Sequence, residues 1–497
     1  MTAKVLMIQG SSSSAGKSLI TTALCRIFAR RGIKVAPFKA QNMSNNAAVC
    51  ADGSEIGRAQ ALQAAAAKLE PTVDMNPVLI KPEADSRSQI ILMGRAWQTL
   101  KAKTYYEKKE ILWEHVKASL DRLRNSHELI VIEGAGSPAE LNLKRGDIVN
   151  MAVAKYANAP VLLVGDIDRG GIFAQLIGTH FLLEPDEQKL MRGFIVNKFR
   201  GDFSLFVDGI QIIEQKSDVP VLGVIPYIKD LYLPDEDAVS VEVASHSAKP
   251  ASPSQTDIAV IALPRISNAD DFDSLRAELN IHIRHIDSLE KLGNPNAIII
   301  PGTKSTIADL NWLQETGLAN AIIQFANNGG EVVGICGGYQ MLGETIHDPY
   351  HVESQKDSVN GLGLLPVKTI FAKTKSTYQI KATILKFENL TNEIIQGYEI
   401  HMGETESQTQ WLEIDSRNGE QVSVKDGSLS PNGKVWGCYI HGLFANDLFR
   451  HTWLSRLGWR GEVVSQSVRF ENSLEKLADV VENALDMKKL EKIIWES

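Results

Sequence analysis

The first thirty residues constrain the fold most, because they place an apolar strand, a Gly/Ser-rich loop and a helix in direct succession. Residues 5–8 indicate the strand, the loop spans residues 10–18, and an apolar stripe along residues 19–28 indicates the helix, which Gly32 ends. Backbone N–H groups of such a loop, together with the helix N-terminus, bind phosphate groups. We therefore expect a nucleotide site at the edge of a parallel α/β sheet.

The loop also carries a lysine and a hydroxyl with separate expected roles. Lys17 would reach the outer phosphate oxygens, and the Ser18 hydroxyl would bind Mg²⁺. The backbone contacts would come from Gly10, Ser14 and Gly16. Five residues separate Gly10 from Gly16, one more than in the usual loop. A Ser-rich turn before a helix is the alternative interpretation, but the placement of Gly-Lys-Ser favours nucleotide binding.

Further apolar runs predict a doubly wound, mostly parallel sheet. They alternate with helical segments and occupy residues 33–38, 129–132, 160–164, 193–196 and 219–226. Ligands of such sheets bind where strands end. Lys39, Gln41 and Asn42 follow the second of these strands, so we expect them to contact substrate, although a solvated polar loop would have the same composition.

Several acidic residues also follow predicted strands. Glu133 ends a buried strand and is the expected Mg²⁺ ligand, with Asp52 as a second candidate, although each could be an ordinary structural or solvated carboxylate. Two further groups of polar residues follow later strands. Asp166, Asp168 and Arg169 could bind substrate or metal, or could form internal ion pairs. Asn197 and Lys198 are placed to contact the nucleotide base.

A second α/β series begins after residues 243–255, which are Ser/Pro-rich and predict a linker. Within this series, residues 331–335 predict a buried strand and residues from 339 onward a helix, with Cys336 at the turn between them. Small residues two positions before and after Cys336 allow a sharp elbow that exposes the sulfur, and the helix dipole favours a nucleophilic thiolate. A buried cysteine among glycines that only permit packing is the alternative.

The same series contains possible partners for Cys336. His441 follows a predicted strand and would act as the general base. The glycine turn at Gly302, together with Gly337, would supply oxyanion donors. Residues 397–405 are a rival source of the base or of substrate contacts, and Tyr398 among them is an expected glutamine contact. A helical stripe from residue 472 onward indicates packing rather than a site.

Composition excludes several classes of protein. A chain of 497 residues holds two to four domains, and a net charge of −8 without a long basic run argues against a nucleic-acid or anionic-membrane partner. No apolar run reaches 18 residues, and the N-terminus enters a strand without a signal peptide. The four cysteines lack the spacing of a zinc site or disulfide framework, so we expect a reducing, cytoplasmic setting. A homo-oligomer is compatible with the sequence.

Taken together, these motifs resemble the cobyric acid synthase family over essentially the whole chain. The first half is similar to the nucleotide fold of dethiobiotin synthetase, and the second half is similar to a class I glutamine amidotransferase. The resemblance rests on residues 9–18, 37–46, 133–138, 166–171, 397–401 and 439–442.

The resemblance implies a glutamine-hydrolysing amidoligase of cobalamin biosynthesis. Members of the family amidate the b, d, e and g carboxylates of adenosylcobyrinic acid a,c-diamide, a corrinoid, and use one ATP and one glutamine for each. By resemblance, Cys336 is the nucleophile and His441 is its base, while ATP and Mg²⁺ act in the first domain. Ammonia must arrive unprotonated, so we expect a protected route between the two sites.

The implied domains are a synthetase domain (1–242), a linker (243–255), an amidotransferase domain (256–450) and a helical extension (451–497) packed on the amidotransferase domain. One departure concerns the residue that orients His441. Related amidotransferases carry a Glu two positions after the histidine, where this chain has Leu443. The sister enzyme cobyrinic acid a,c-diamide synthase is the alternative. A partition-type regulatory ATPase is a more distant alternative. Such a protein would have lost the nucleophile, whereas this chain has both Cys336 and His441.

Overall fold

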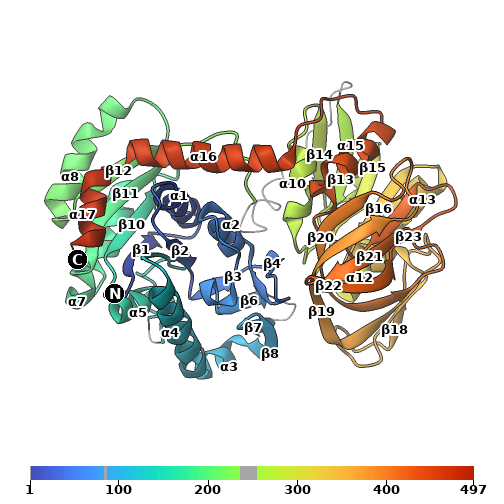
Figure 1. Cartoon of the computed structure of the whole chain (residues 1–497), viewed down its shortest axis with the longest axis horizontal. Helices are drawn as coiled ribbons and strands as arrows, with labels where there is room; N and C mark the ends of the chain where they lie inside the picture. The colour runs from blue at the N-terminus through green and yellow to red at the C-terminus, as the bar shows by residue number, and fades with distance from the viewer. Residues whose placement is uncertain (1, 83–86, 145, 235–254, 497) are drawn as a thin grey trace.

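The computed structural model describes residues 2–82, 87–144, 146–234 and 255–496. Figure 1 shows two α/β units, with the long helix α16 (Gln466–Ala484) running from the second back across the first. Residues 243–254 of the predicted linker lie outside the described residues. Within the described ranges, no helix is both long and apolar enough to cross a membrane.

The first unit is built on a six-stranded sheet in which every neighbouring pair is parallel. Its strand order is β12-β11-β10-β1-β9-β2, which is the doubly wound topology expected from the alternating apolar runs. The strands are β1 (Lys4–Gly10), β2 (Val35–Phe38), β9 (Leu129–Glu133), β10 (Val161–Asp166), β11 (Met191–Phe199) and β12 (Val221–Pro226).

Helices cover both faces of this sheet and form two separate apolar clusters. One face packs against α1 (Lys17–Arg30), α16 and α17 (Met487–Trp495). The other face packs against α4 (Lys109–Ser126), α5 (Met151–Ala157) and α8 (Val207–Ser217). Because both faces are buried, the central strands are apolar along their whole length. This burial explains their continuous hydrophobic runs in the sequence.

Smaller elements extend the first unit towards the second. A four-stranded sheet of order β3-β6-β7-β8 adjoins a two-stranded ribbon, β4-β5. Helix α2 follows β5 directly. The bounds are β3 (Gln41–Met43), β4 (Ala47–Val49), β5 (Glu55–Gly57), α2 (Arg58–Ala66), β6 (Val78–Pro82), β7 (Arg87–Leu92), β8 (Arg95–Lys101) and α3 (Ala102–Glu107).

The second unit has two sheets that share one core. The first has the order β14-β13-β15-β16-β24-β23 and is parallel except for its last pair. Its strands are β13 (Thr256–Ile261), β14 (Ile281–Ile286), β15 (Ala297–Ile300), β16 (Glu331–Ile335), β23 (Ser428–Leu429) and β24 (Val435–Cys438). Its helices include α12 (Thr306–Glu315), α13 (Leu318–Asn327), α14 (Gly337–Leu342) and α15 (Asp447–Arg456).

The second sheet of this unit is mostly antiparallel and has the order β18-β17-β19-β21-β22, with β20 also paired to β19. Strand β20 crosses above the loop that follows β16 and therefore bears on the site described below. The strands are β17 (Thr345–His347), β18 (Ser358–Asn360), β19 (Lys368–Ile384), β20 (Ile394–Glu406), β21 (Leu412–Arg417) and β22 (Glu420–Asp426).

The expected packing of residues 451–497 on the amidotransferase domain is wrong for most of the segment. Trp453 and Trp459 lie in the second unit's core, but Leu474 and Leu477 of α16 join the apolar cluster of β1 and α1 in the first unit. Ion pairs reinforce this docking; they join Arg26 and Arg30 of α1, and Arg31 directly after it, to Glu471, Glu475, Asp479, Glu482 and Glu491. An amphipathic stripe predicts that a helix packs, but not on which surface.

Candidate active sites

The loop between β1 and α1 has the geometry of a phosphate site. Gly16 caps α1 in the left-handed region, with φ of 106°, so the first N–H groups of the helix have no helical acceptor. The Lys17 ammonium folds back over the loop, 2.9 Å from Ser12 O and 3.1 Å from Gly136 O. Two backbone carbonyl oxygens therefore hold the lysine ammonium over the loop.

Glu133 is the centre of the polar contacts beside this loop. The strand pairing sets Glu133 opposite Ile8, directly before the loop. Its Oε1 accepts hydrogen bonds from the Ser18 hydroxyl at 2.9 Å and from the Lys39 ammonium at 2.8 Å, and its Oε2 accepts one from Gln63. A hydroxyl beside one buried carboxylate fits Mg²⁺, which takes few protein ligands and completes its shell with phosphate and water.

Asp52, the other metal candidate, lies elsewhere. It occupies the turn between β4 and β5, where its carboxylate accepts hydrogen bonds from Ser54. Neither Ser18 nor Glu133 is among its hydrogen-bond partners in the part of the chain that the structure describes. In those same ranges, no cluster of three His, Cys, Asp or Glu residues could hold a metal.

Asp166, the last residue of β10, and Asp168 form internal ion pairs, which were one of the roles expected for them. Asp166 pairs with Lys198 at 2.8 Å and with Arg169 at 3.5 Å, while Asp168 pairs with Arg200 at 2.8 Å. Lys198 of β11 and Arg200 directly after it therefore hold the end of β10 and the loop that follows it.

The two residues expected near the nucleotide base contact the backbone of the phosphate loop. Asn197 donates to Ala15 O at 2.9 Å and Lys198 donates to Ser14 O at 2.7 Å. Both therefore shape the loop, and contact with a base stays a prediction.

A cavity of about 1,930 Å³ opens in front of the phosphate loop. Lys39, Gln41 and Asn42 all line it, as expected for residues that follow β2. Two of them are also fixed by neighbours, since Gln41 accepts from the Tyr105 hydroxyl and Asn42 donates to Gln60 at 3.1 Å. Ligand pockets usually measure about 300–1,000 Å³, so this cavity has room for a nucleotide and a second large ligand.

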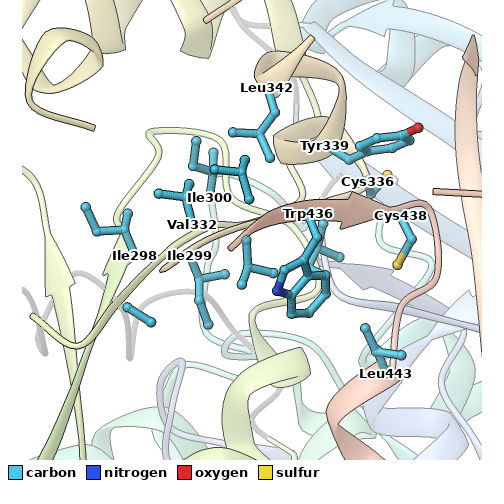
Figure 2. Packing of buried hydrophobic residues seen from close by; sticks show 14 of the residues in the cluster. Ile298, Ile299, Ile300, Val332, Cys336, Tyr339, Leu342, Trp436, Cys438 and Leu443 are labelled. Carbon is cyan, nitrogen blue, oxygen red and sulfur yellow. The ribbon is translucent and has the colours of Figure 1, made fainter. Parts of the chain in front are cut away.

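The predicted elbow at Cys336 is present in the second unit. Cys336 follows β16 and has φ of 51° and ψ of −109°, a strained conformation for a residue with a Cβ. The turn is tight enough that a Cβ on Gly338 would lie 2.0 Å from Ile300 O, so glycine is required there. Figure 2 shows Cys336 at this turn, with Tyr339 and Leu342 on the following helix and Trp436 and Cys438 on the neighbouring strand.

The sulfur is less exposed than the sequence predicts. Cys336 is only 6% exposed, because β20 covers the elbow and places Ile400 O 3.6 Å from Sγ. The other cysteines are unsuited to nucleophilic chemistry: burial raises the pKa of Cys50 to about 11, and raises those of Cys25 and Cys438 well above the ordinary range.

His441 lies beside Cys336 and is oriented by an acid that the sequence did not reveal. Its Nδ1 is 2.7 Å from Asp271 Oδ2, and Asp271 Oδ1 accepts a hydrogen bond from Gly442 N at 2.8 Å. Burial alone would lower the pKa of His441, but the charge of Asp271 and the interaction with Cys336 outweigh it and raise this pKa to about 10. The three side chains form a Cys–His–Asp arrangement.

Tyr398 and Gly302 adjoin this arrangement. Tyr398 stacks on the His441 ring at 5.2 Å and exchanges backbone hydrogen bonds with it. A Cβ on Gly302 would lie 2.9 Å from His441 Cε1, so glycine at this position lets the loop after β15 approach the imidazole. Gly337 begins α14, and its N–H therefore lacks a helical acceptor. His401 instead stacks on Tyr439 and contacts Glu399, which disfavours it as the base.

Asp271 and Gln63 were both missed. Asp271 lies in the short 3-10 helix Ala269–Phe272 rather than directly after a strand, and its contact with His441 spans 170 residues, so no local pattern marks it. Gln63 lies in the middle of α2 within an Ala/Gln-rich stretch, where the sequence gives no sign of a contact with Glu133.

Comparison with known proteins assigns each unit to a domain family. Residues 6–241 match the CobQ/CobB/MinD/ParA nucleotide binding domain, and residues 257–449 match the CobB/CobQ-like glutamine amidotransferase domain. The cobyric acid synthase of Herpetosiphon aurantiacus is 53% identical over 100% of this chain and 99% of its own length. That of Chloroflexus aggregans is 54% identical over 99% of each chain. The expected resemblance is confirmed: the chain belongs to the cobyric acid synthase family of glutamine-hydrolysing amidoligases in cobalamin biosynthesis.

Proposed function

We propose that the chain converts adenosylcobyrinic acid a,c-diamide to adenosylcobyric acid by amidating its b, d, e and g carboxylates with nitrogen from glutamine. The observation that carries this proposal is the presence, on one chain matching cobyric acid synthases over its full length, of a phosphate site and a buried Cys–His–Asp arrangement. One site would activate a carboxylate and the other would release ammonia.

In the proposed glutaminase reaction, Cys336 Sγ attacks the side-chain carbonyl of glutamine and forms a C–S bond. Donors near Gly302 and Gly337 hold the resulting oxyanion. His441 gives its proton to the departing nitrogen, the C–N bond breaks, and ammonia leaves behind a glutamyl thioester. His441 then takes a proton from water, which attacks the thioester and releases glutamate and Cys336. Asp271 keeps the imidazole in the required orientation throughout.

In the proposed synthetase reaction, a corrinoid carboxylate attacks the terminal phosphate of ATP, forms an acyl phosphate and releases ADP. A carboxylate is a poor electrophile because oxide would have to leave, and phosphorylation supplies a better leaving group. Lys17 orients the terminal phosphate, while Ser18 and Glu133 are the residues that would hold Mg²⁺. Bound Mg²⁺ neutralises charge that develops on the phosphates. Ammonia then attacks the acyl phosphate, and inorganic phosphate departs.

The cavity in front of the phosphate loop is the proposed corrinoid site. Its lining includes the apolar side chains of Ile90 and Leu100 and the polar side chains of Tyr105 and Lys109. An apolar wall suits the flat face of a macrocycle, and basic groups suit carboxylates on its rim. Repeated amidation requires the corrinoid to rebind in several orientations, which a cavity of about 1,930 Å³ permits.

Two further features belong to the proposal. Ammonia would pass between the sites by a protected route, so an external ammonia scavenger should leave glutamine-dependent ligation intact; trapping of the ammonia during turnover would contradict this. A reducing, cytoplasmic setting fits the function, because all four cysteines are buried free thiols.

The experiment compares wild type with Cys336→Ser, using ATP, Mg²⁺ and adenosylcobyrinic acid a,c-diamide, with glutamine or ammonium as nitrogen source. We expect the variant to lose glutamine-dependent ligation and keep ammonia-dependent ligation. Loss of both reactions in a folded variant would contradict the division into two sites. A wild type that amidates cobyrinic acid instead would assign the chain to the sister activity.

A further inference from the structure

Helix α2 contacts the phosphate site through a residue in its middle and the second unit through its first residue. Gln63 donates a hydrogen bond to Glu133, the carboxylate beside Ser18 in the phosphate site. Arg58, the first residue of the helix, forms an ion pair with Asp270 of the second unit at 2.7 Å. In Figure 1 this nine-residue helix lies on the side of the first unit that faces the second. A single short helix therefore carries both a contact with Glu133 and a contact with the residue that precedes Asp271.

Arg58 is one of three contacts through which the first unit holds the segment 268–271. Ala47 N donates to Asn268 Oδ1 at 3.2 Å, and Ala269 N donates to Asn46 Oδ1 at 3.3 Å. Asp270 accepts from Arg58, and the next residue, Asp271, accepts from His441 and Gly442. The acid that orients the catalytic histidine thus belongs to a segment whose position is set by the other unit.

Arg58 offsets part of the negative charge in this segment. Asp270 and Asp271 are consecutive, and the side chain of each is almost fully buried. Burial raises the pKa of Asp270, the charge of Asp271 adds to this, and Arg58 opposes both. Without Arg58, ionised Asp270 would be a buried charge beside a second one. The segment would relieve this by turning Asp270 towards water, which moves Asp271 away from His441.

The first unit also touches the strand that covers the nucleophile. Ile400 of β20 packs with Ala47, Leu79 and Ile91 of the first unit, and its carbonyl oxygen is the atom 3.6 Å from Cys336 Sγ. Both the acid end and the sulfur end of the Cys–His–Asp arrangement are therefore bounded by residues that rest on the first unit.

We propose that Arg58 is a positioning residue of the glutaminase site, supplied by the synthetase unit, and that α2 couples the two sites. A ligand that rearranges Glu133 shifts Gln63, and α2 carries this shift through Arg58 to Asp270 and Asp271. Glutamine is then hydrolysed fastest when the synthetase site is filled. The inference rests on the proposed function and adds to it a mechanism for coupling.

The test measures glutamate release by the full-length protein, with and without a non-hydrolysable ATP analogue, Mg²⁺ and adenosylcobyrinic acid a,c-diamide. Wild type should hydrolyse glutamine faster with these ligands. Arg58→Ala should lower kcat about 10- to 100-fold, because small displacements of catalytic groups have effects of this size. Its KM for glutamine should stay within about twofold, since Arg58 is placed to orient the histidine rather than to bind substrate.

Three variants sharpen the test. Arg58→Lys keeps a cation beside Asp270 and should restore most of the rate and the response to ligands. Asn268→Gly removes the acceptor for Ala47 N but tolerates the local φ of 53°, so it should weaken the response without a charge change. Arg192→Ala, at an exposed arginine of β11, is the matched control and should behave as wild type.

Ammonia-dependent ligation separates failure of this inference from failure of the proposed function. Arg58→Ala should ligate ammonia at the wild-type rate, because the phosphate site is intact. Wild-type values of kcat and of ligand stimulation in Arg58→Ala would overturn the inference, as would a wild type whose glutaminase ignores the ligands. A wild type that neither hydrolyses glutamine nor ligates ammonia would overturn the proposed function itself.

Discussion

The phosphate site and the glutaminase site differ in how open they are and in whether one unit or both units form them. The phosphate site opens into a large cavity, and its loop backbone, Lys17 and Glu133 all belong to one sheet edge of one unit. The glutaminase site is a closed contact among Cys336, His441 and Asp271, and its acid rests on the other unit. The first site must admit large ligands, whereas the second must be silent until ammonia can be used. Dependence on the interface provides that control.

The largest effect is expected when Asp271, the acid of the closed site, is replaced. Asp271→Asn should reduce kcat for glutamine hydrolysis by about 10⁴-fold, as when the acid of a catalytic triad is replaced. The amide no longer holds His441 in one orientation or stabilises its charge. Steady-state glutamate release measures the loss. Unchanged ammonia-dependent ligation is the control, and a loss below tenfold would exclude Asp271 from the proposed role.

The same variant tests the pH dependence of the site. The pKa of His441 is raised to about 10, so the imidazole keeps its proton below that pH and loses it as the pH rises through about 10. Asp271→Asn removes a charge that raises this pKa, and the alkaline limb of the residual glutaminase profile should move to lower pH. An alkaline limb at the same pH in both proteins would contradict this origin of the shift.

Loss of the buried Glu55 carboxylate at the interface between the two units should lower the stability of the folded protein. Glu55 of the first unit pairs with Lys81 and, at 2.7 Å, with Lys375 of the second. Glu55→Gln leaves two buried ammonium groups without their acid and should destabilise the folded protein by about 3–5 kcal/mol in denaturant titration. Asp415→Asn, on a partly buried residue of β21, is the comparison.

The Glu55 carboxylate also gives this stability a pH dependence. Burial alone would raise its pKa, but Lys375 and Lys81 together lower it to about 2. Its contribution is therefore complete above the unfolded value of 4.5 and is lost as the pH falls through about 2. The stability difference between wild type and Glu55→Gln should shrink on acidification, and a constant difference would contradict the assignment.

A smaller loss is expected at the open site. Lys17→Ala should reduce ATP-dependent ligation by about 10²–10³-fold, the usual cost of losing one group that stabilises developing charge. Glutamine hydrolysis without ligands should remain within about twofold of wild type, since neither Asp271 nor its supporting contacts involve Lys17. A parallel loss of unstimulated glutaminase activity would show that the sites are not separable.

The smallest effect concerns the ion pairs between α1 and α16. Arg30→Ala should cost about 0.5–1 kcal/mol at low salt and almost nothing at high salt, because partly exposed pairs are weak and screened. Leu477→Ala should cost about 2–5 kcal/mol at either salt concentration, because it opens a cavity in the apolar contact between α16 and the first unit. Equal salt dependence of the two variants would contradict this division.

Local sequence patterns were sufficient to predict motifs in which a strand, a turn and a helix follow one another directly. The phosphate loop and the Cys336 elbow could be predicted because each is a contiguous stretch whose residue sizes require the observed backbone. Asp271 and the docking of α16 could not, since each depends on which distant surface is adjacent. The exposure of Cys336 was misjudged for the same reason: β20 covers it from 64 residues further along the chain.

The most direct test of the central claim follows the nitrogen atom. Wild type is supplied with glutamine labelled with ¹⁵N in its side-chain amide, an excess of unlabelled ammonium, ATP, Mg²⁺ and adenosylcobyrinic acid a,c-diamide, and the corrinoid product is analysed by mass spectrometry. Two coupled sites predict four new amides that carry mainly ¹⁵N. A product whose new amides carry mainly unlabelled nitrogen, or an unchanged corrinoid beside free glutamate, would contradict the account.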